Sequence, residues 1–247
     1  MANSNLPQQP VPFLNFLRQL LQVHGRSLLL LLVGVVLPLL GFENLALVIW
    51  RNEGTFPWDE PILQIIHTTE TPQLTTIAAT LTRLGGLKGG TLIGATLTLT
   101  LLLLRRWRSA TYVLITLVGN GFINRTVKAL LHRTRPHLWE SVAPQSDFAF
   151  PSGHAMTSMA LIITLLILFW GSRWGWLILL GGSGFVLTIA WTRLYLGVHF
   201  PSDILAGWLV SLAWAIGVSV IIRPHLTQAS SPDTTQLTPS EESAIVE

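Results

Sequence analysis

Cysteine is absent from this 247-residue chain, and charged side chains make up only 11% of it. Without cysteine the chain has no disulfide framework, no thiolate catalysis and no thiolate metal site. The basic residues are scattered along the chain and are not gathered on one soluble face, which argues against a nucleic-acid-binding protein. Because the charges are so few, we expect those that cluster to serve a specific chemistry.

Apolar residues dominate instead: half of the chain is hydrophobic, and its mean hydropathy is +0.54. About 20 apolar residues cross the hydrocarbon core of a bilayer. The sequence therefore predicts an all-α, integral membrane bundle of six helices, with spans at residues 28–50, 87–104, 110–131, 155–171, 174–192 and 204–222. The first apolar run starts near Leu28 and no small-residue cleavage pattern follows it, so we expect this helix to be retained as an anchor.

Three regions are expected along the chain. Residues 1–26 would form a cytoplasmic N-terminal segment that is partly amphipathic, with apolar positions at helical spacing over 13–21. Residues 27–223 would form the six-span membrane domain. Residues 224–247, rich in Ser, Thr and Pro, would form a disordered tail.

The stretch 51–83 is too polar to span a membrane, but its apolar positions keep helical spacing. We predict two short interfacial helices here, separated near Pro72. They would lie in the first outer loop, and the working hypothesis is that the amphipathic stretch 57–83 guides the entry of lipids.

Lysine and arginine placement predicts the orientation, because cytoplasmic loops carry an excess of both. With six spans the two sides receive 7 and 8 basic residues, which decides nothing. Five of the 8 belong to or flank the polar clusters described next, and leaving them out gives 7 against 3. We therefore predict cytoplasmic termini in an inner or plasma membrane, with all the polar clusters on the outer face.

The first polar cluster, Lys128 with Arg135-Pro136, follows the third predicted span. Charges in or beside a span are costly and usually functional. A guanidinium fork and an ammonium group both suit phosphoryl oxygens. For Arg125 and Arg133 we expect a different role, contact with lipid head groups at the interface.

The second cluster, Pro151-Ser152-Gly153-His154, precedes the fourth span. Ser152 is a good N-cap, and Gly153 allows the backbone to approach a ligand closely. A helix N-terminus is a ready anion site, and His154 would point at the same anion. Taken alone, the cluster fits a plain helix cap beside an interfacial histidine equally well.

The third cluster joins the fifth and sixth spans and contains Arg193, His199 and Asp203. Pro201 suits the first turn of a helix, which puts the Asp203 carboxylate near the helix start and within reach of His199. A carboxylate on one ring nitrogen fixes the tautomer and makes the other nitrogen a better nucleophile. A lone pair of this kind would more often be a capping aspartate beside an incidental histidine.

A metal fits these clusters poorly. Three cations would repel a divalent ion, and Asp203 is the one carboxylate available. Zinc would need neutral, ligated histidines within this positive field. We therefore predict no metal and no other cofactor.

Together the three clusters resemble, in order and spacing, the signature of the type 2 phosphatidic acid phosphatase superfamily: Lys128-x6-Arg135-Pro136, Pro151-Ser152-Gly153-His154 and Thr192-Arg193-x5-His199-x3-Asp203. Each part is weak alone, and the three in order are very specific. Region 51–222 resembles the bacterial membrane branch that includes phosphatidylglycerophosphatase B-like and undecaprenyl-diphosphatase enzymes. Thr192 stands where the family usually has serine, and the hydroxyl is kept.

The resemblance implies a role for each residue. His199 would be the nucleophile that forms a phosphohistidine, Asp203 would orient it, and His154 would protonate the leaving alkoxide and then help to activate water. The phosphoryl oxygens would be held by Lys128, Arg135, Ser152, Gly153 and Arg193. Phosphoryl transfer needs mainly positioning and charge stabilisation, which these cations can supply without metal.

The function expected is that of a metal-independent lipid phosphate phosphatase, whose partners are the bilayer and a membrane lipid phosphate. Phosphatidic acid, phosphatidylglycerol phosphate and undecaprenyl diphosphate are the candidate substrates. Two alternatives stay open: a vanadate site of the haloperoxidase kind, and a transporter or binding protein that uses the anion site without turnover. The sequence leaves the oligomeric state undetermined.

Overall fold

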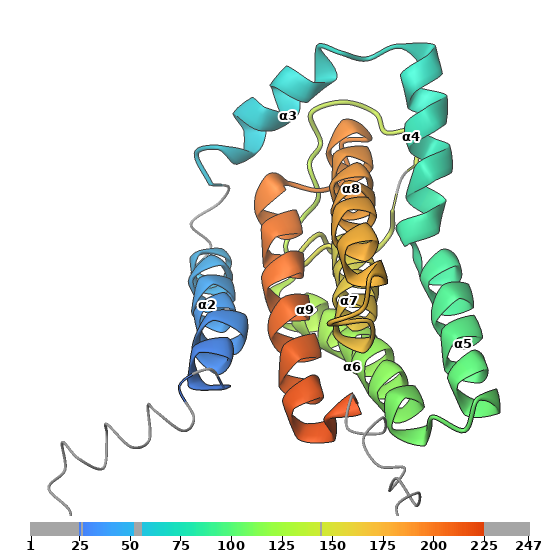
Figure 1. The fold of residues 1–247 in the computed structure, drawn as a ribbon. Coiled ribbons are helices and arrows are strands. Elements are labelled where there is room, and N and C mark those ends of the chain that lie inside the picture. The colour runs from blue at the N-terminus through green and yellow to red at the C-terminus, as the bar shows by residue number, and fades with distance from the viewer. Residues whose placement is uncertain (1–24, 26, 52–55, 144, 225–247) are drawn as a thin grey trace, which may run out of the picture.

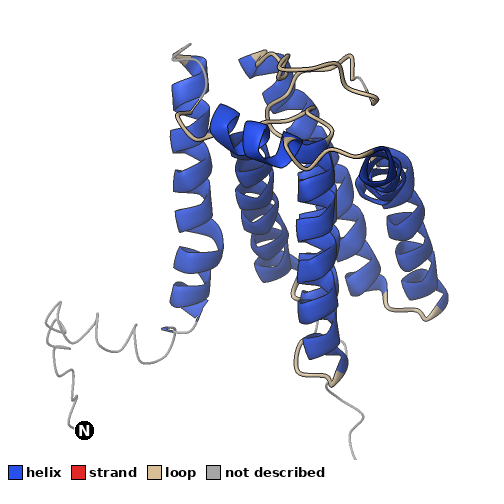
Figure 2. Cartoon of the chain, turned by 90° about the horizontal axis from the view of Figure 1, so that it is seen from above, coloured by secondary structure: helices blue, strands red, loops and turns tan. Residues whose placement is uncertain are grey.

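The computed structural model describes residues 25, 27–51, 56–143 and 145–224 (Figure 1). The predicted amphipathic stretch 13–21, and the tail from residue 225 on, lie outside the described residues. Within the described part the regular secondary structure is helical, which confirms the predicted all-α class (Figure 2).

The helices follow the predicted spans closely. The chain order is η1 (Leu32–Val36, a π-helical turn), α2 (Leu37–Trp50), α3 (Asp59–His67), α4 (Pro72–Gly85), α5 (Leu87–Leu103), α6 (Trp107–Leu131), α7 (Gly153–Leu168), α8 (Trp174–Tyr195) and α9 (Pro201–Ile222). The two short helices predicted within 51–83 are α3 and α4, and α4 begins at Pro72 as expected for a proline in a first helical turn.

Not every helix is long and apolar enough to cross a bilayer. Among the described residues three helices pass on length and composition, namely Ser27–Trp50, α8 and α9, and α4 with α5 passes as one unit bent by 41°. Helix α7 is apolar but has 16 residues, and α6 has 25 residues but carries Asn120, Asn124, Arg125 and Lys128. The chain is therefore a membrane protein with a helix at each of the six predicted positions, while the count of six spans stays a prediction.

The outward surfaces of these helices are apolar. Phe122 of α6 is 71% exposed, Leu180 of α8 is 72% exposed and Ile221 of α9 is 82% exposed. A soluble protein rarely exposes so many large apolar side chains together, because water penalises apolar surface. A bilayer removes this penalty, and the exposed side chains fit a surface that faces lipid.

Helix α9 packs against α7, α2 and α6, while α8 packs against α7 and α4. Figure 1 shows α2 along one flank of this group and α5 along the opposite flank. Helix α3 lies across one end of the bundle, between the end of α2 and the start of α4 (Figure 1).

The three sequence clusters meet at that same end. The backbone N–H of Ser152, before α7, donates to the carbonyl of Asp203 in the first turn of α9 at 3.1 Å. The N–H of Ala149 donates to the carbonyl of Arg133, beyond the end of α6, at 2.9 Å. The clusters therefore share one end of the bundle, as the parity of the spans predicts. The side of the membrane that this end faces stays a prediction.

Gly207 allows α7 and α9 to approach closely beside the clusters. A Cβ at this position would lie 3.0 Å from the carbonyl oxygen of Ser152 and 3.2 Å from side-chain atoms of Ala155 and Met156. A backbone carbonyl cannot move away without shifting the start of α7. The absence of a side chain at Gly207 thus fixes the distance between α9 and the Ser152 segment.

We expect Gly207→Ala to destabilise the protein by about 1 kcal/mol, because the added methyl group overpacks this contact. Gly217→Ala is the matched control on the same helix, since a Cβ there meets nothing within 4 Å. Alanine favours a helix over glycine by up to about 1 kcal/mol, so the control should hold or raise the melting temperature. Thermal unfolding of both variants in detergent measures the difference, and equal melting temperatures would contradict the tight contact.

Candidate active site

His199 and Asp203 form a buried pair at the start of α9. Pro201 begins the helix, and the Asp203 Oδ2 atom accepts a hydrogen bond from the Phe200 N–H at 2.9 Å. The same oxygen lies 3.3 Å from Nδ1 of His199. The contact predicted from the four-residue spacing is therefore present, and both side chains are 2% exposed or less.

The other ring nitrogen of His199 faces a cation. Nε2 lies 3.1 Å from Nη1 of Arg135. A guanidinium group donates hydrogen bonds and cannot accept them. Nε2 is therefore the acceptor, and Nδ1 carries the proton that it donates to Asp203.

Burial lowers the pKa of His199 well below its ordinary value, and the charges of Arg135, Arg193, Lys128 and His154 lower it further. A lowered histidine pKa favours the neutral ring. The lone pair on Nε2 is consequently available at neutral pH, which is what a nucleophile requires.

Lys128 lies near the end of α6 and Arg135 in the loop after it, and both contact Asp147. Arg135 donates from Nη1 to the Val198 carbonyl at 2.5 Å and from Nη2 to Oδ1 of Asp147 at 2.5 Å. Lys128 Nζ lies 2.8 Å from Oδ2 of Asp147 and also donates to the Phe148 carbonyl. One carboxylate thus joins the two cations predicted to bind phosphate.

Asp147 was not identified from the sequence. Burial raises the pKa of its carboxyl, but hydrogen bonds and charges from Lys128 and Arg135 outweigh this and lower the pKa to about 2. The side chain is 56% exposed, so an incoming anion can replace it. Asp147 is one of two acidic residues between the first and second clusters, and that scarcity is the signal that could have drawn attention to it.

Two donors of Arg193 have no partner in the part of the chain that the structure describes. Its side chain is buried, and Nη1 donates to Oγ1 of Thr82 on α4 at 2.9 Å. Nε and Nη2 have no hydrogen-bond partner among the described residues, and neither has the buried Oγ of Ser152. A buried guanidinium that leaves two N–H groups unused is costly unless an anion accepts them. These groups therefore favour an anion site.

The start of α7 differs in one respect from the sequence prediction. Ser152 occupies the N-cap position, but its hydroxyl makes no capping hydrogen bond. The residue is fully buried against α9, and its backbone N–H is tied to Asp203. The prediction was right about the position and wrong about the hydroxyl. The N–H groups of the first turn of α7 are left for an anion.

Two neighbours hold the second cluster in place. Asn124 of α6 donates from Nδ2 to the Pro151 carbonyl at 3.0 Å, and a Cβ on Gly153 would come within 3.2 Å of the Asn124 amide oxygen. His154 lies against the break between α4 and α5, where a Cβ at Gly86 would be 3.0 Å from its Nε2. Glycine at 86 thus leaves room for this imidazole.

Arg133 corrects a further prediction. Instead of contacting lipid head groups it is buried, and it forms ion pairs with Asp59 of α3 at 2.7 Å and Asp203 at 2.5 Å. The cause is local: α6 ends at Leu131, and His132 takes the left-handed conformation, with φ of 49°. After this left-handed residue the Arg133 side chain is buried. Nothing in the sequence singled out Asp59 from the other acidic residues of the stretch 51–83.

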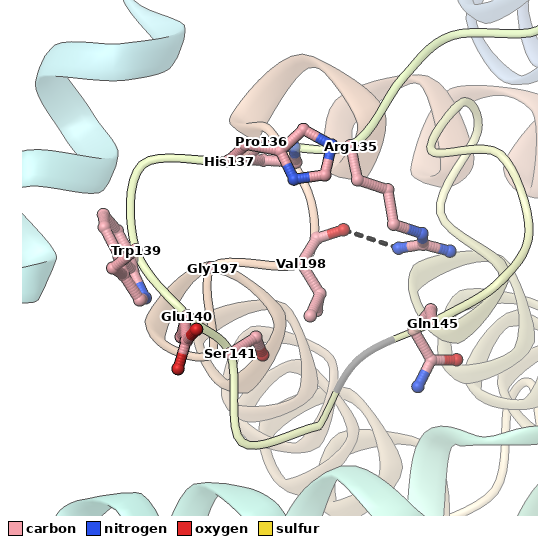
Figure 3. Close-up of a pocket in the computed structure, with 9 residues that line it drawn as sticks. All are labelled: Arg135, Pro136, His137, Trp139, Glu140, Ser141, Gln145, Gly197 and Val198. Carbon is pink, nitrogen blue, oxygen red and sulfur yellow. Dashed lines mark hydrogen bonds between the residues drawn. The ribbon is translucent and has the colours of Figure 1, made fainter.

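A cavity of about 420 Å³ opens beside Arg135 (Figure 3). It lies between the loop around Trp139 and Ser141 and the turn at Gly197 and Val198. Ser141 anchors the loop by donating to the Leu196 carbonyl at 2.6 Å. The Arg135 guanidinium thus has open space on one side and His199 on the other.

We predict that Asp147→Asn binds inorganic phosphate several-fold more tightly than the unchanged protein. The variant removes the carboxylate that competes for Lys128 and Arg135, and one lost charge contact of this kind corresponds to about 1 kcal/mol. Calorimetric titration of the detergent-purified protein measures the affinity, with Ser146→Ala as the neighbouring exposed control. Weaker phosphate binding by Asp147→Asn would mean that the carboxylate organises the cations instead of competing for them.

Solved structures share this architecture. The transmembrane PAP2-type phosphatidylglycerolphosphate phosphatase of Bacillus subtilis superposes with a TM-score of 0.69 at 22% identity, covering 77% of this chain and 96% of that one. LpxE of Aquifex aeolicus superposes with a TM-score of 0.56 at 20% identity, covering 66% of this chain and 95% of that one. At these identities the likeness is one of fold.

Sequence comparison finds relatives over shorter stretches. Undecaprenyl-diphosphatase of Sulfolobus acidocaldarius is 35% identical over 78 residues, which are 32% of this chain and 35% of the relative. Phosphatidylglycerophosphatase B of Bacillus subtilis is 30% identical over 96 residues, 36% of this chain and 46% of the relative. Lipid A 1-phosphatase of Rhizobium johnstonii is 31% identical over 123 residues, 45% of this chain and 46% of the relative.

The chain thus spans between a third and a half of the length of these curated relatives. The family model of the PAP2 superfamily matches residues 109–226. That range runs from the start of α6 to just beyond the end of α9 and contains all three polar clusters. Residues 109–226 of this chain belong to the PAP2 superfamily.

Proposed function

We propose that this chain hydrolyses the phosphate monoester or diphosphate of a membrane lipid, through a phosphohistidine and without a metal. The observation that carries the proposal is the setting of His199. Its Nδ1 is engaged by Asp203, and its Nε2 faces the Arg135 guanidinium. Arg193 adds two unused N–H groups in the same site. A nucleophile directed at an anion site is the arrangement that phosphoryl transfer needs.

In the first step the Nε2 lone pair attacks phosphorus and the bond from phosphorus to the lipid oxygen breaks. Without substrate, burial and the charges of Arg193 and Arg135 disfavour a proton on His154, and the negative charge of the bound phosphate offsets this effect. His154 then gives its proton to the departing alkoxide or phosphate. Arg135, Lys128 and Arg193 stabilise the charge on the equatorial oxygens, together with the N–H groups at the start of α7. The Asp203 carboxylate accepts the Nδ1–H bond, which stabilises the positive charge that develops on the ring.

In the second step water attacks phosphorus and the bond between phosphorus and Nε2 breaks. His154, now neutral, takes the proton of the attacking water. Inorganic phosphate leaves and the His199 ring regains its lone pair. His199 and His154 thus return to their starting states, with one water consumed and one inorganic phosphate released.

The chemistry of the donors supports a reaction without a metal. The two buried carboxylates near the site, Asp59 and Asp203, are both engaged by the Arg133 guanidinium. The third carboxylate, Asp147, is held by Lys128 and Arg135. Cations thus occupy the oxygens that a divalent ion would need, and they supply the charge that the ion would bring.

The surroundings of the site support a membrane lipid as the substrate. The clusters lie at one end of apolar helices whose outer surfaces fit a bilayer, so a head group at the interface can reach them. The named relatives act on undecaprenyl diphosphate, phosphatidylglycerophosphate and lipid A. We include in the proposal cytoplasmic termini and a site on the outer face of an inner or plasma membrane.

Trapping of labelled phosphate tests the nucleophile. We expect wild-type protein quenched in base during turnover of a ³²P-labelled lipid to retain label, and His199→Ala to retain none and to lose about a thousandfold or more in kcat. His154→Ala should lose much of its activity as well, because the leaving group departs unprotonated. His24→Ala, outside the three clusters, is the matched control. Full activity of His199→Ala would refute the assignment.

Phosphate release across a lipid panel tests the reaction itself. Detergent-purified protein should release phosphate from at least one of phosphatidic acid, phosphatidylglycerol phosphate and undecaprenyl diphosphate, at the same rate with and without EDTA. A rate that EDTA abolishes and magnesium restores would contradict the metal-free chemistry. Release from none of the lipids would refute the proposed function.

A further inference from the structure

Behind the His199–Asp203 pair lies a buried charge network that the chemistry above does not use directly. Arg133 donates from Nη1 to Oδ1 of Asp203 at 2.5 Å and from Nη2 to Oδ2 of Asp59 at 2.7 Å. Both carboxylates are fully buried, and Arg133 is 7% exposed. Asp59 belongs to α3, Arg133 to the loop after α6 and Asp203 to α9. One guanidinium therefore links three separate parts of the chain.

The Asp59 end of the network is fully hydrogen-bonded. Ser202 donates its backbone N–H to Oδ1 of Asp59 at 3.0 Å and its hydroxyl to Oδ2 at 2.6 Å. The same hydroxyl accepts a hydrogen bond from Nη1 of Arg133 at 2.7 Å. The Phe56 N–H also donates to Oδ2 at 3.2 Å. So complete a set of partners fixes the orientation of a buried carboxylate.

Asp59 also determines where the Arg133 guanidinium lies. Its planar fork spans two carboxylates, and its carbon sits 4.5 Å from the centre of the Phe200 ring. Without the Asp59 contact the fork could turn and bind Asp203 with both nitrogens, which is the geometry that arginine and carboxylate prefer. Asp59 thus keeps Arg133 on one oxygen of Asp203.

That restriction matters because the two oxygens of Asp203 have different tasks. Oδ1 accepts from Arg133, while Oδ2 accepts from the Phe200 N–H and faces Nδ1 of His199. A guanidinium bound to both oxygens would rotate the carboxylate away from His199 or compete for Oδ2. The Asp59 contact therefore preserves the oxygen that orients the nucleophile.

The net charge of the network also favours the activation of His199. Two carboxylates and one guanidinium leave a net charge of −1, whereas Arg133 and Asp203 alone would be neutral. The remaining negative charge stabilises the positive ring that forms when His199 attacks phosphorus. In a buried, low-dielectric environment such a charge acts over several ångströms.

We propose that Asp59, acting through Arg133, is a positioning residue that holds Asp203 in the orientation needed to activate His199. This inference rests on the proposed phosphatase function. It gives a role to the first outer loop, whose purpose the sequence left open. It also ties the position of α3, at the end of the bundle, to the reactivity of the nucleophile.

The pH dependence distinguishes this role from a purely structural one. The groups that act on His199 are Asp203, Arg135, Arg193, Lys128 and His154. Replacing Asp59 by asparagine removes a negative charge behind them, so the neutral ring of His199 is favoured further and its pKa falls. Activity needs the neutral ring, and the acid limb of kcat/KM should therefore move to lower pH.

The experiment compares Asp59→Asn with Glu70→Gln, which removes an exposed carboxylate just after α3. We expect Asp59→Asn to lower kcat about tenfold, or 1.36 kcal/mol, with KM unchanged within about twofold. Its acid limb should shift by about half a pH unit or more toward low pH. Glu70→Gln should match the wild type in all three measurements.

Ser202→Ala keeps every charge of the network and is the second test variant if Asp59→Asn does not fold. It should lower kcat without moving the acid limb, because it loosens the geometry alone. The inference would be overturned if folded Asp59→Asn kept the wild-type kcat and an unmoved acid limb. If only Ser202→Ala folds, a wild-type kcat in that variant would overturn it. Inactive wild-type protein would instead overturn the proposed function.

Discussion

Asp203 is the residue on which the geometry of the site depends. Its backbone carbonyl accepts the N–H of Ser152, which sets the start of α7 against the start of α9. Its carboxylate contacts His199, Arg133 and the N–H of Phe200. One residue therefore joins the second and third sequence clusters to the loop after α6, which lies within the first cluster. Because it is fully buried, these contacts are not weakened by competition from water.

The site holds many charges in a chain that has few. Burying a charge is costly unless it is paired, and the structure pairs most of them. Arg133 is shared between Asp59 and Asp203, and Asp147 is shared between Lys128 and Arg135. Arg193 is the exception among these cations, with two donors unused in the described part of the chain. This difference in pairing distinguishes Arg133, whose ion pairs stabilise the fold, from Arg193, whose unused donors suit an anion.

Helix positions could be predicted because membrane helices need long apolar runs, and such runs are visible in any sequence. The pair of His199 and Asp203 could be predicted because four residues around a helix start lie close together in space. Asp59 could not be predicted, and for Asp147 the one signal is the scarcity of acidic residues between the first and second clusters. Each is separated from its partners by loops whose path depends on packing. Arg133 was misjudged for the same reason, since a left-handed residue at His132 decides that it points inward.

The sequence by itself determined the all-helical membrane class, because long apolar runs favour membrane helices. It also determined the order of the three clusters, and the number of helices between them placed all three at one end of the bundle. Tertiary structure alone decided which carboxylate pairs with which cation. Asp59 and Arg133 are 74 residues apart, and Arg133 and Asp203 are 70 apart. Charges so distant along the chain meet only when the helices pack, and their pairing decides which donors are left for the proposed phosphate.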